Sequence, residues 1–143
     1  MDEELTSQRD VFGMKLAGAV PRLISYLIDG VILGVAFQIL FLVTGASGNS
    51  TEFSLVYFLA GVAGIGYYIY FFGNGQTLGM KAMKIKLIGT DGTYPVGYGK
   101  GILRYLGMVV STMILLLGYI WILIDKKNQG WHDKIAGTYV VEE

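Results

Sequence analysis

The chain has 143 residues, of which 53% are apolar and only 15% are charged, and its formal net charge is zero. Soluble domains carry about a quarter of charged residues, so this composition indicates a single integral membrane domain with the lipid bilayer as its partner. The zero net charge gives no case for nucleic acid as a partner. The absence of cysteine excludes disulfides and thiolate metal sites, and one histidine cannot build a histidine cluster, so we expect no metal.

The first apolar run covers residues 23–43 and is long enough, at about 1.5 Å per residue, to cross a bilayer as a helix. Residues 1–20 precede it as an acidic and polar lead, unlike the basic start of a signal peptide. Pro21 suits the first turn of this helix, where its missing N–H is not needed. Gly30 and Gly34 form a G-x-x-x-G pattern, which predicts a surface for close helix packing.

Two further apolar regions follow. Residues 55–72 are uncharged and end in clustered Tyr and Phe, which is typical of a membrane–water boundary. The lead, the second loop and the tail carry basic residues whereas the first loop has none, so the positive-inside rule places those three in the cytoplasm. Three full crossings would put the tail outside. We therefore predict that the third region is a helical hairpin with arms at residues 97–116 and 119–126, and three plain spans remain the alternative.

Short segments outside these runs are expected at the membrane surface. Residues 73–86 place three lysines among apolar side chains, which predicts an interfacial helix or strand. Residues 84–96 hold a Thr-Asp-Gly turn between alternating flanks, which predicts a β-hairpin, and the final YVVEE suits an extended segment. The predicted fold is an all-α, multi-pass protein of the cell membrane, with residues 21–141 as its membrane domain and both termini cytoplasmic.

Five ionisable residues form a candidate charge network: Arg22, Asp29, Arg104, His132 and Asp133. Asp29 lies well inside the first run, where a short carboxylate cannot reach the headgroups and must be paired or functional. Arg22 is on the same helical face but about 10 Å away along the axis, so a direct pair is strained; a water-bridged pair or a partner in Arg104 remains open. Both arginines are also suited to the membrane–water boundary, where their long side chains can reach the lipid headgroups. His132 is a candidate proton relay, although a lone histidine is more often a packing residue.

Four motifs, in this order, resemble the RDD family of small membrane proteins. They are Arg22 with Asp29, GQTLGMKAMKIKLIGTDG at residues 75–92, Arg104 at the start of the next helix, and WHDKIAGTYVV at residues 131–141. The family is named for one arginine and two aspartates. The resemblance assigns these to Arg22, Asp29 and Asp133, with Asp125 as the other candidate for the last. It also implies transport of a ligand, and some members of the family look like sodium/proton antiporters.

Two functions follow from these observations; the sequence favours the first, and the second is its alternative. In the first, the chain exchanges Na⁺ or K⁺ for protons: Asp29 binds each in turn, Arg22 tunes its pKa, and Asp133 forms a cytoplasmic gate or relay. In the second, the chain is a non-transporting scaffold or accessory subunit whose charges form a buried structural lock. No phosphate-binding loop, dinucleotide fingerprint or nucleophile elbow is present, so we expect neither enzyme activity nor a cofactor. A bundle this small has little interior, so we expect a homo-oligomer.

Overall fold

The computed structural model describes residues 10–44, 49–114 and 116–143, which are mostly helical. The helices are α2 (Ala19–Thr44), α3 (Ser50–Gly73), α4 (Leu78–Ala82), α5 (Tyr98–Met113), α6 (Leu117–Ile120), the 3-10 helix η1 (Trp121–Leu123) and α7 (Trp131–Ala136). The strands are β1 (Asp10–Val11), β2 (Met14–Lys15), β3 (Ile85–Gly89) and β4 (Thr138–Glu142). The expected helical character is confirmed, but "all-α" is too narrow, because these strands form two small sheets. Most of the expected lead, residues 1–9, lies outside the described residues.

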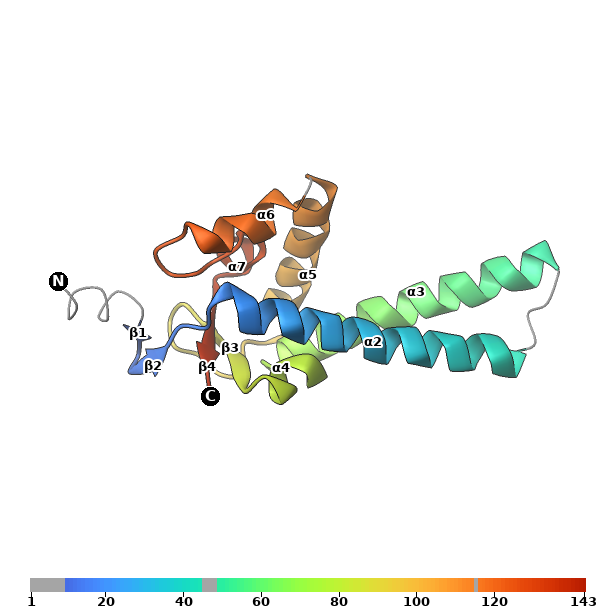
Figure 1. Ribbon diagram of the computed structural model, residues 1–143, viewed down its shortest axis with the longest axis horizontal. Helices are drawn as coiled ribbons and strands as arrows, with labels where there is room; N and C mark the ends of the chain where they lie inside the picture. The colour runs from blue at the N-terminus through green and yellow to red at the C-terminus, as the bar shows by residue number, and fades with distance from the viewer. Residues whose placement is uncertain (1–9, 45–48, 115) are drawn as a thin grey trace.

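The two longest helices, α2 and α3, lie side by side and extend away from the rest of the chain (Figure 1). Each is long and apolar enough to cross a membrane. Many of their large apolar side chains are exposed in the isolated chain, as expected of helices that face lipid. The predicted spans at residues 23–43 and 55–72 lie within α2 and α3, and Pro21 lies in the first turn of α2.

The third apolar region is bent. Helix α5 ends at Met113, and α6 begins at Leu117 and continues into η1, with an angle of 109° between the two parts. The break therefore lies close to the predicted one, between residues 116 and 119. The described part of the chain thus has two helices that are long and apolar enough to span a membrane, or three if the bent pair forms one span.

A small sheet connects the start of α2 with the end of the chain. β3 pairs antiparallel with β4, and Leu16 bridges to Val141, so β4 lies between them. The extended C-terminal segment is confirmed, but the hairpin predicted within residues 84–96 is wrong. Pro95 follows the turn and has no N–H for a ladder, whereas β4 offers the buried side chains of Val140 and Val141 to the buried strand β3.

An apolar core joins this sheet to α4 and to the end of α3. Its buried members are Ala17, Phe72, Met80, Ile85, Leu87, Val96 and Val140. Burial of each large apolar side chain stabilises the fold by roughly 1.5–3 kcal/mol. Because Met80 on α4 is part of this core, the residues just before it are held against α2, where the first of two polar clusters forms.

Candidate functional site

Three buried residues of α2, Arg22, Ser25 and Asp29, face the compact part of the molecule. Their spacing of three and four residues places them on one helical face, as the sequence predicts. The two charged residues nevertheless take different partners. They belong to two clusters, which we call the Asp29 cluster (Asp29, Tyr67, Thr77 and Gly79) and the Asp133 cluster (Arg22, Tyr26, Arg104, His132 and Asp133).

In the Asp29 cluster, three neutral donors surround one fully buried carboxylate. Oδ1 of Asp29 accepts hydrogen bonds from the Tyr67 hydroxyl at 2.6 Å and from the Gly79 N–H at 2.8 Å. Oδ2 accepts from the Thr77 hydroxyl at 2.6 Å. A buried carboxylate is costly unless such donors satisfy its oxygens. Here three donors do so, and the described hydrogen bonds to this carboxylate include none from an arginine or a lysine.

The segment from Thr77 to Gly79 fits Asp29 through its local structure. Thr77 is the N-cap of α4, and its hydroxyl accepts from the Met80 N–H at 3.1 Å while it donates to Asp29. Gly79 lies directly against α2: a Cβ at this position would be 2.1 Å from the Ser25 carbonyl oxygen and 2.9 Å from Asp29 Cγ. Only glycine permits this close approach, so α4 can donate its backbone N–H to the carboxylate.

In the Asp133 cluster, two arginines converge on one carboxylate. Arg22 from α2 and Arg104 from α5 each form a salt bridge with a different oxygen of Asp133. The Gly130 N–H donates to the oxygen shared with Arg22, at 2.8 Å. Both arginines and Asp133 are at most 2% exposed. Removal of the carboxylate would leave two uncompensated buried charges, so Asp133 ties α2, α5 and α7 together.

Other N–H groups of the two arginines reach the tail and Tyr26. Arg22 donates to the Asn128 carbonyl, and a second nitrogen of Arg22 lies 3.3 Å from Nε2 of His132. Arg104 donates to the Tyr26 hydroxyl at 3.3 Å. That hydroxyl is in turn 3.2 Å from Nε2 of His132. The cluster is therefore one connected network rather than two separate ion pairs.

His132 is neutral in this network. Burial lowers the pKa of His132 to about 3; Asp133 opposes the shift, and Arg104 and Arg22 add to it. Because Arg22 and Tyr26 both donate toward Nε2, the ring proton is placed on Nδ1. Burial alone raises the pKa of the Asp133 carboxyl, but Arg104 and Arg22 outweigh it and hold that pKa well below its usual range. Asp133 is therefore ionised.

The Asp133 cluster carries one net positive charge, because two arginines face one aspartate and His132 is neutral. It also has unused hydrogen-bonding capacity. Among the described residues, four buried side-chain atoms have no partner, and three of them belong to this cluster: Nε of Arg22, Nε of Arg104 and Nδ1 of His132, the fourth being Oγ of Ser111. Buried donors are usually satisfied, so these atoms indicate where a further polar group can bind.

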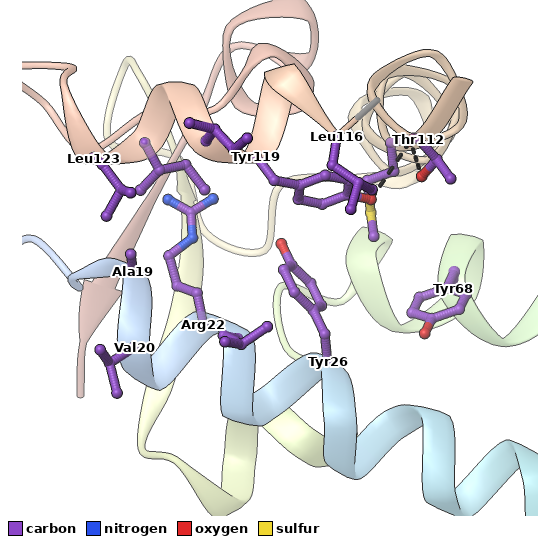
Figure 2. Close-up of a pocket in the computed structure, with 13 residues that line it drawn as sticks. Ala19, Val20, Arg22, Tyr26, Tyr68, Thr112, Leu116, Tyr119 and Leu123 are labelled. Atoms are coloured by element: carbon purple, nitrogen blue, oxygen red, sulfur yellow. Dashed lines mark hydrogen bonds between the residues drawn. The ribbon is translucent and has the colours of Figure 1, made fainter. Parts of the chain in front are cut away.

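A cavity of about 630 Å³ lies beside this cluster, between α2, α5 and the α6–η1 segment. Figure 2 shows Arg22 and Tyr26 pointing from α2 toward α6 and η1, with Tyr119 and Thr112 across from them. Most of the lining is apolar, with Leu23, Met108, Leu116, Ile120, Ile122 and Leu123 among its residues. Arg22 therefore belongs both to the buried network and to the wall of this cavity.

Comparison with known proteins identifies the family. The sequence model of the RDD family matches residues 16–137, which include every residue of both clusters. The chain belongs to the RDD family. Together with the two apolar helices, this membership makes it a membrane protein.

Curated relatives of this RDD protein fall into two kinds. The proline-rich antigen homolog of Mycobacterium tuberculosis (strain ATCC 25618 / H37Rv) is 29% identical over 92 residues, which are 61% of this chain and 38% of that protein. The proline-rich antigen of Mycobacterium leprae is 34% identical over 65 residues, 46% of this chain and 26% of that protein. The chain thus spans less than half of these mycobacterial relatives. Uncharacterized protein YxaI of Bacillus subtilis is 31% identical over 149 residues, 89% of this chain and 97% of that protein. No solved structure matches the chain.

The structure separates the residues that give the RDD family its name. Arg22 lies with Asp133, Arg104 and His132, whereas Asp29 lies in the other cluster. The described hydrogen bonds and ion pairs include no direct one between Arg22 and Asp29, and Arg22 pairs with Asp133 instead. Asp125, the alternative family aspartate, instead pairs with Lys134 at 2.7 Å at the surface. This placement favours Asp133 as the second aspartate.

Sequence reasoning missed the partners of Asp29. Tyr67 belongs to the aromatic cluster that was interpreted as a membrane boundary, and Thr77 and Gly79 belong to the family-like motif at residues 75–92. The available signal was the spacing of Thr77 and Gly79: a threonine that can cap a helix is followed two residues later by a residue without a side chain. Gly30 and Gly34 are predicted to pack helices; apart from the neighbouring backbone of their own helix, no atom of the described residues lies within 4 Å of a Cβ built at either position.

Proposed function

We propose that this RDD protein is a non-transporting membrane scaffold or accessory subunit in which Arg22, Asp29 and Asp133 form two structural locks. The donor set of Asp29 carries this proposal: both oxygens accept hydrogen bonds, and all three donors are neutral groups of the protein. Sodium sites in transporters are lined by carbonyl and carboxylate oxygens that face the ion. Around Asp29, hydroxyl and amide hydrogens face the carboxylate instead.

Each lock joins elements that are distant in the sequence. The Asp29 cluster fixes α2 to α3 through Tyr67 and to α4 through Thr77 and Gly79. The Asp133 cluster fixes α2 to α5 and α7. Buried polar groups of this kind can specify one arrangement of helices. In this proposal, their role is to hold the two long helices at a defined angle to the compact unit, which is then presented at the membrane surface to a partner subunit.

We propose that both ends of the chain lie on the cytoplasmic side of the cell membrane. The pairing of Leu16 with Val141 and the 2.8 Å bond from the Ala17 N–H to the Val140 carbonyl support a common side, because both segments meet in one sheet. The basic residues of the lead, second loop and tail support the cytoplasm as that side.

Exchange of Na⁺ or K⁺ for protons is the second candidate, and the position of Asp29 favours it. An ionisable residue inside a spanning helix is a functional candidate by default. Two of the groups bonded to Asp29 are hydroxyls, which can pass a proton on as well as donate one. In this version, movement of α4 away from α2 frees the carboxylate for a cation, and the Asp133 cluster, with His132 as a relay, forms the cytoplasmic gate.

One experiment separates the two candidates. Purified protein in liposomes receives a Na⁺ or K⁺ pulse while the internal pH is recorded, with Asp29→Asn in parallel and the exposed Asp91→Asn as a matched control. The scaffold proposal predicts no cation-dependent proton flux from wild type and a loss of about 2 kcal/mol of stability in Asp29→Asn, because one of its hydrogen bonds is lost or reversed. A flux that folded Asp29→Asn lacks and Asp91→Asn retains would establish exchange instead.

We also propose that the chain forms a homo-oligomer through its glycine-rich helix faces. Cβ positions built at Gly30, Gly34 and Gly64 meet no described atom within 4 Å, so these faces are open to a close-packed helix from a second copy, with Ala60 beside them. The mass of the protein in nanodiscs tests this proposal. A mass of one chain per particle, at protein concentrations that saturate the discs, contradicts it.

A further inference from the structure

The cavity beside Arg22 has a polar end and a long apolar wall. Its volume of about 630 Å³ falls in the range of small-molecule sites. Leu23, Met108, Ile120 and Leu123 contribute to the wall from α2, α5 and the α6–η1 segment. The outer faces of α5 and α6 next to it are apolar as well, with Leu106, Val109, Met113 and Leu117 among the exposed side chains. The cavity is therefore adjacent to surface that suits lipid chains.

Arg22 provides the polar end. Its side chain is 2% exposed and lines the cavity, and its Nε–H has no acceptor among the described residues. The Tyr26 hydroxyl lies beside it and also lines the cavity (Figure 2). The cluster behind them carries one net positive charge, as shown above. A negatively charged oxygen at this end supplies both the missing acceptor and the missing counter-charge.

We propose that the cavity binds an acidic amphiphile, with its anionic head at Arg22 and Tyr26 and its acyl chain against the apolar wall. A neutral amphiphile leaves the positive charge of the cluster unbalanced, and a small soluble anion leaves the apolar wall uncovered. A fatty acid carboxylate and the phosphodiester of an anionic phospholipid share the chemistry required. This ligand site goes beyond the scaffold role, because neither lock needs an external molecule to form.

Native mass spectrometry of the full chain in a nonionic detergent tests the site. The probes are palmitate against hexadecanol, which share a chain and differ in the head, and phosphatidylglycerol against phosphatidylcholine with the same acyl chains. The variants are Leu123→Trp, which fills part of the cavity, and Ile124→Trp, a control next to it that does not line the cavity. Leu123 and Ile124 are 70% and 69% exposed, so both variants should fold equally well, which their thermal stability verifies.

We expect wild type to bind palmitate about tenfold more tightly than hexadecanol, since a charge-assisted hydrogen bond distinguishes them. Leu123→Trp should weaken palmitate binding about tenfold, whereas Ile124→Trp should change it by less than about twofold. Stronger binding of phosphatidylglycerol than of palmitate identifies the phospholipid as the source of the head, and the reverse identifies the fatty acid. Equal affinity for palmitate and hexadecanol, or equal effects of the two tryptophans, overturns the proposal.

Discussion

The two buried carboxylates of this chain, Asp29 and Asp133, are stabilised by opposite means. Asp133 faces two arginines and one amide N–H, whereas Asp29 faces two hydroxyls and one amide N–H. The Asp133 cluster depends on charge, and its arginines are buried only because a carboxylate balances them in part. The Asp29 cluster depends on hydrogen bonds from neutral donors, and these donors can still bond to water or to an amide oxygen if the charge is lost.

This difference shows what each aspartate does in the fold. Arg22 and Asp29 share a face of α2, yet the arginine bonds to Asp133 in the tail, so its charge connects the first spanning helix to the end of the chain. Asp29 connects the same helix to α3 and to α4 with its N-cap. Helix α2 is thus bonded to two parts of the chain at two positions along its axis. The two contacts should respond differently when the aspartate is replaced by asparagine.

The largest effect is expected from Asp133→Asn. The amide cannot balance two buried arginines, so we expect a loss of about 3–5 kcal/mol, enough to unfold much of the protein. Asp29→Asn, with its loss of about 2 kcal/mol, provides the comparison. Denaturant unfolding of both variants in the same detergent measures the two values. If Asp29→Asn proves the more destabilising of the two, the distinction between a charge-balanced and a donor-satisfied carboxylate is wrong.

A second test concerns the close contact between Gly79 of the Asp29 cluster and the backbone of α2. Gly79→Ala places a methyl group 2.1 Å from the Ser25 carbonyl oxygen, and α4 must move away from α2. We expect a loss of about 3 kcal/mol and a weakened bond between the Gly79 N–H and Asp29. Gly99→Ala, also at a helical glycine of the same chain but with open space at its Cβ, is the control and should be neutral or slightly stabilising. Thermal unfolding followed by light scattering compares them, and equal melting temperatures would contradict the close contact.

The amino-acid sequence allows the membrane helices and most of the charged residues to be predicted. Long, mostly apolar runs are a direct consequence of the cost of placing polar groups in lipid, so α2 and α3 can be predicted without a structure. A break in the third apolar region was expected because the basic tail conflicts with three full crossings; the bend between α5 and α6 lies close to it, whereas the number of crossings stays a prediction. Residues 16–137 match the family model, as the order of motifs indicates.

Long-range partners were not predictable, for physical reasons. Helical spacing shows that Arg22 and Asp29 share a face, but the choice between two carboxylates depends on where the tail folds back. Likewise, β3 was expected to pair with the residues after its own turn, yet its partner β4 is almost 50 residues later in the chain. The donors of Asp29 are neutral, so a search for opposite charges passes over Tyr67 and Thr77.

The smallest effect is expected from pH, and it distinguishes the clusters without altering either aspartate. Between pH 6.5, the usual pKa of histidine, and pH 3, the unfolded chain binds a proton at His132 that the folded protein does not. Stability should therefore fall as the pH falls from 7 to 5, by about 2 kcal/mol at pH 5. The lowered pKa of Asp133 works in the same direction, but only below about pH 4, where the unfolded carboxyl becomes protonated.

Melting temperatures of wild type and His132→Gln from pH 7 to 5 test this prediction. The decrease of the melting temperature with falling pH should be present in wild type and nearly absent in His132→Gln. A similar slope in both would place the titrating group elsewhere, and a flat wild-type profile would mean that His132 is charged, or easily becomes charged, inside the cluster.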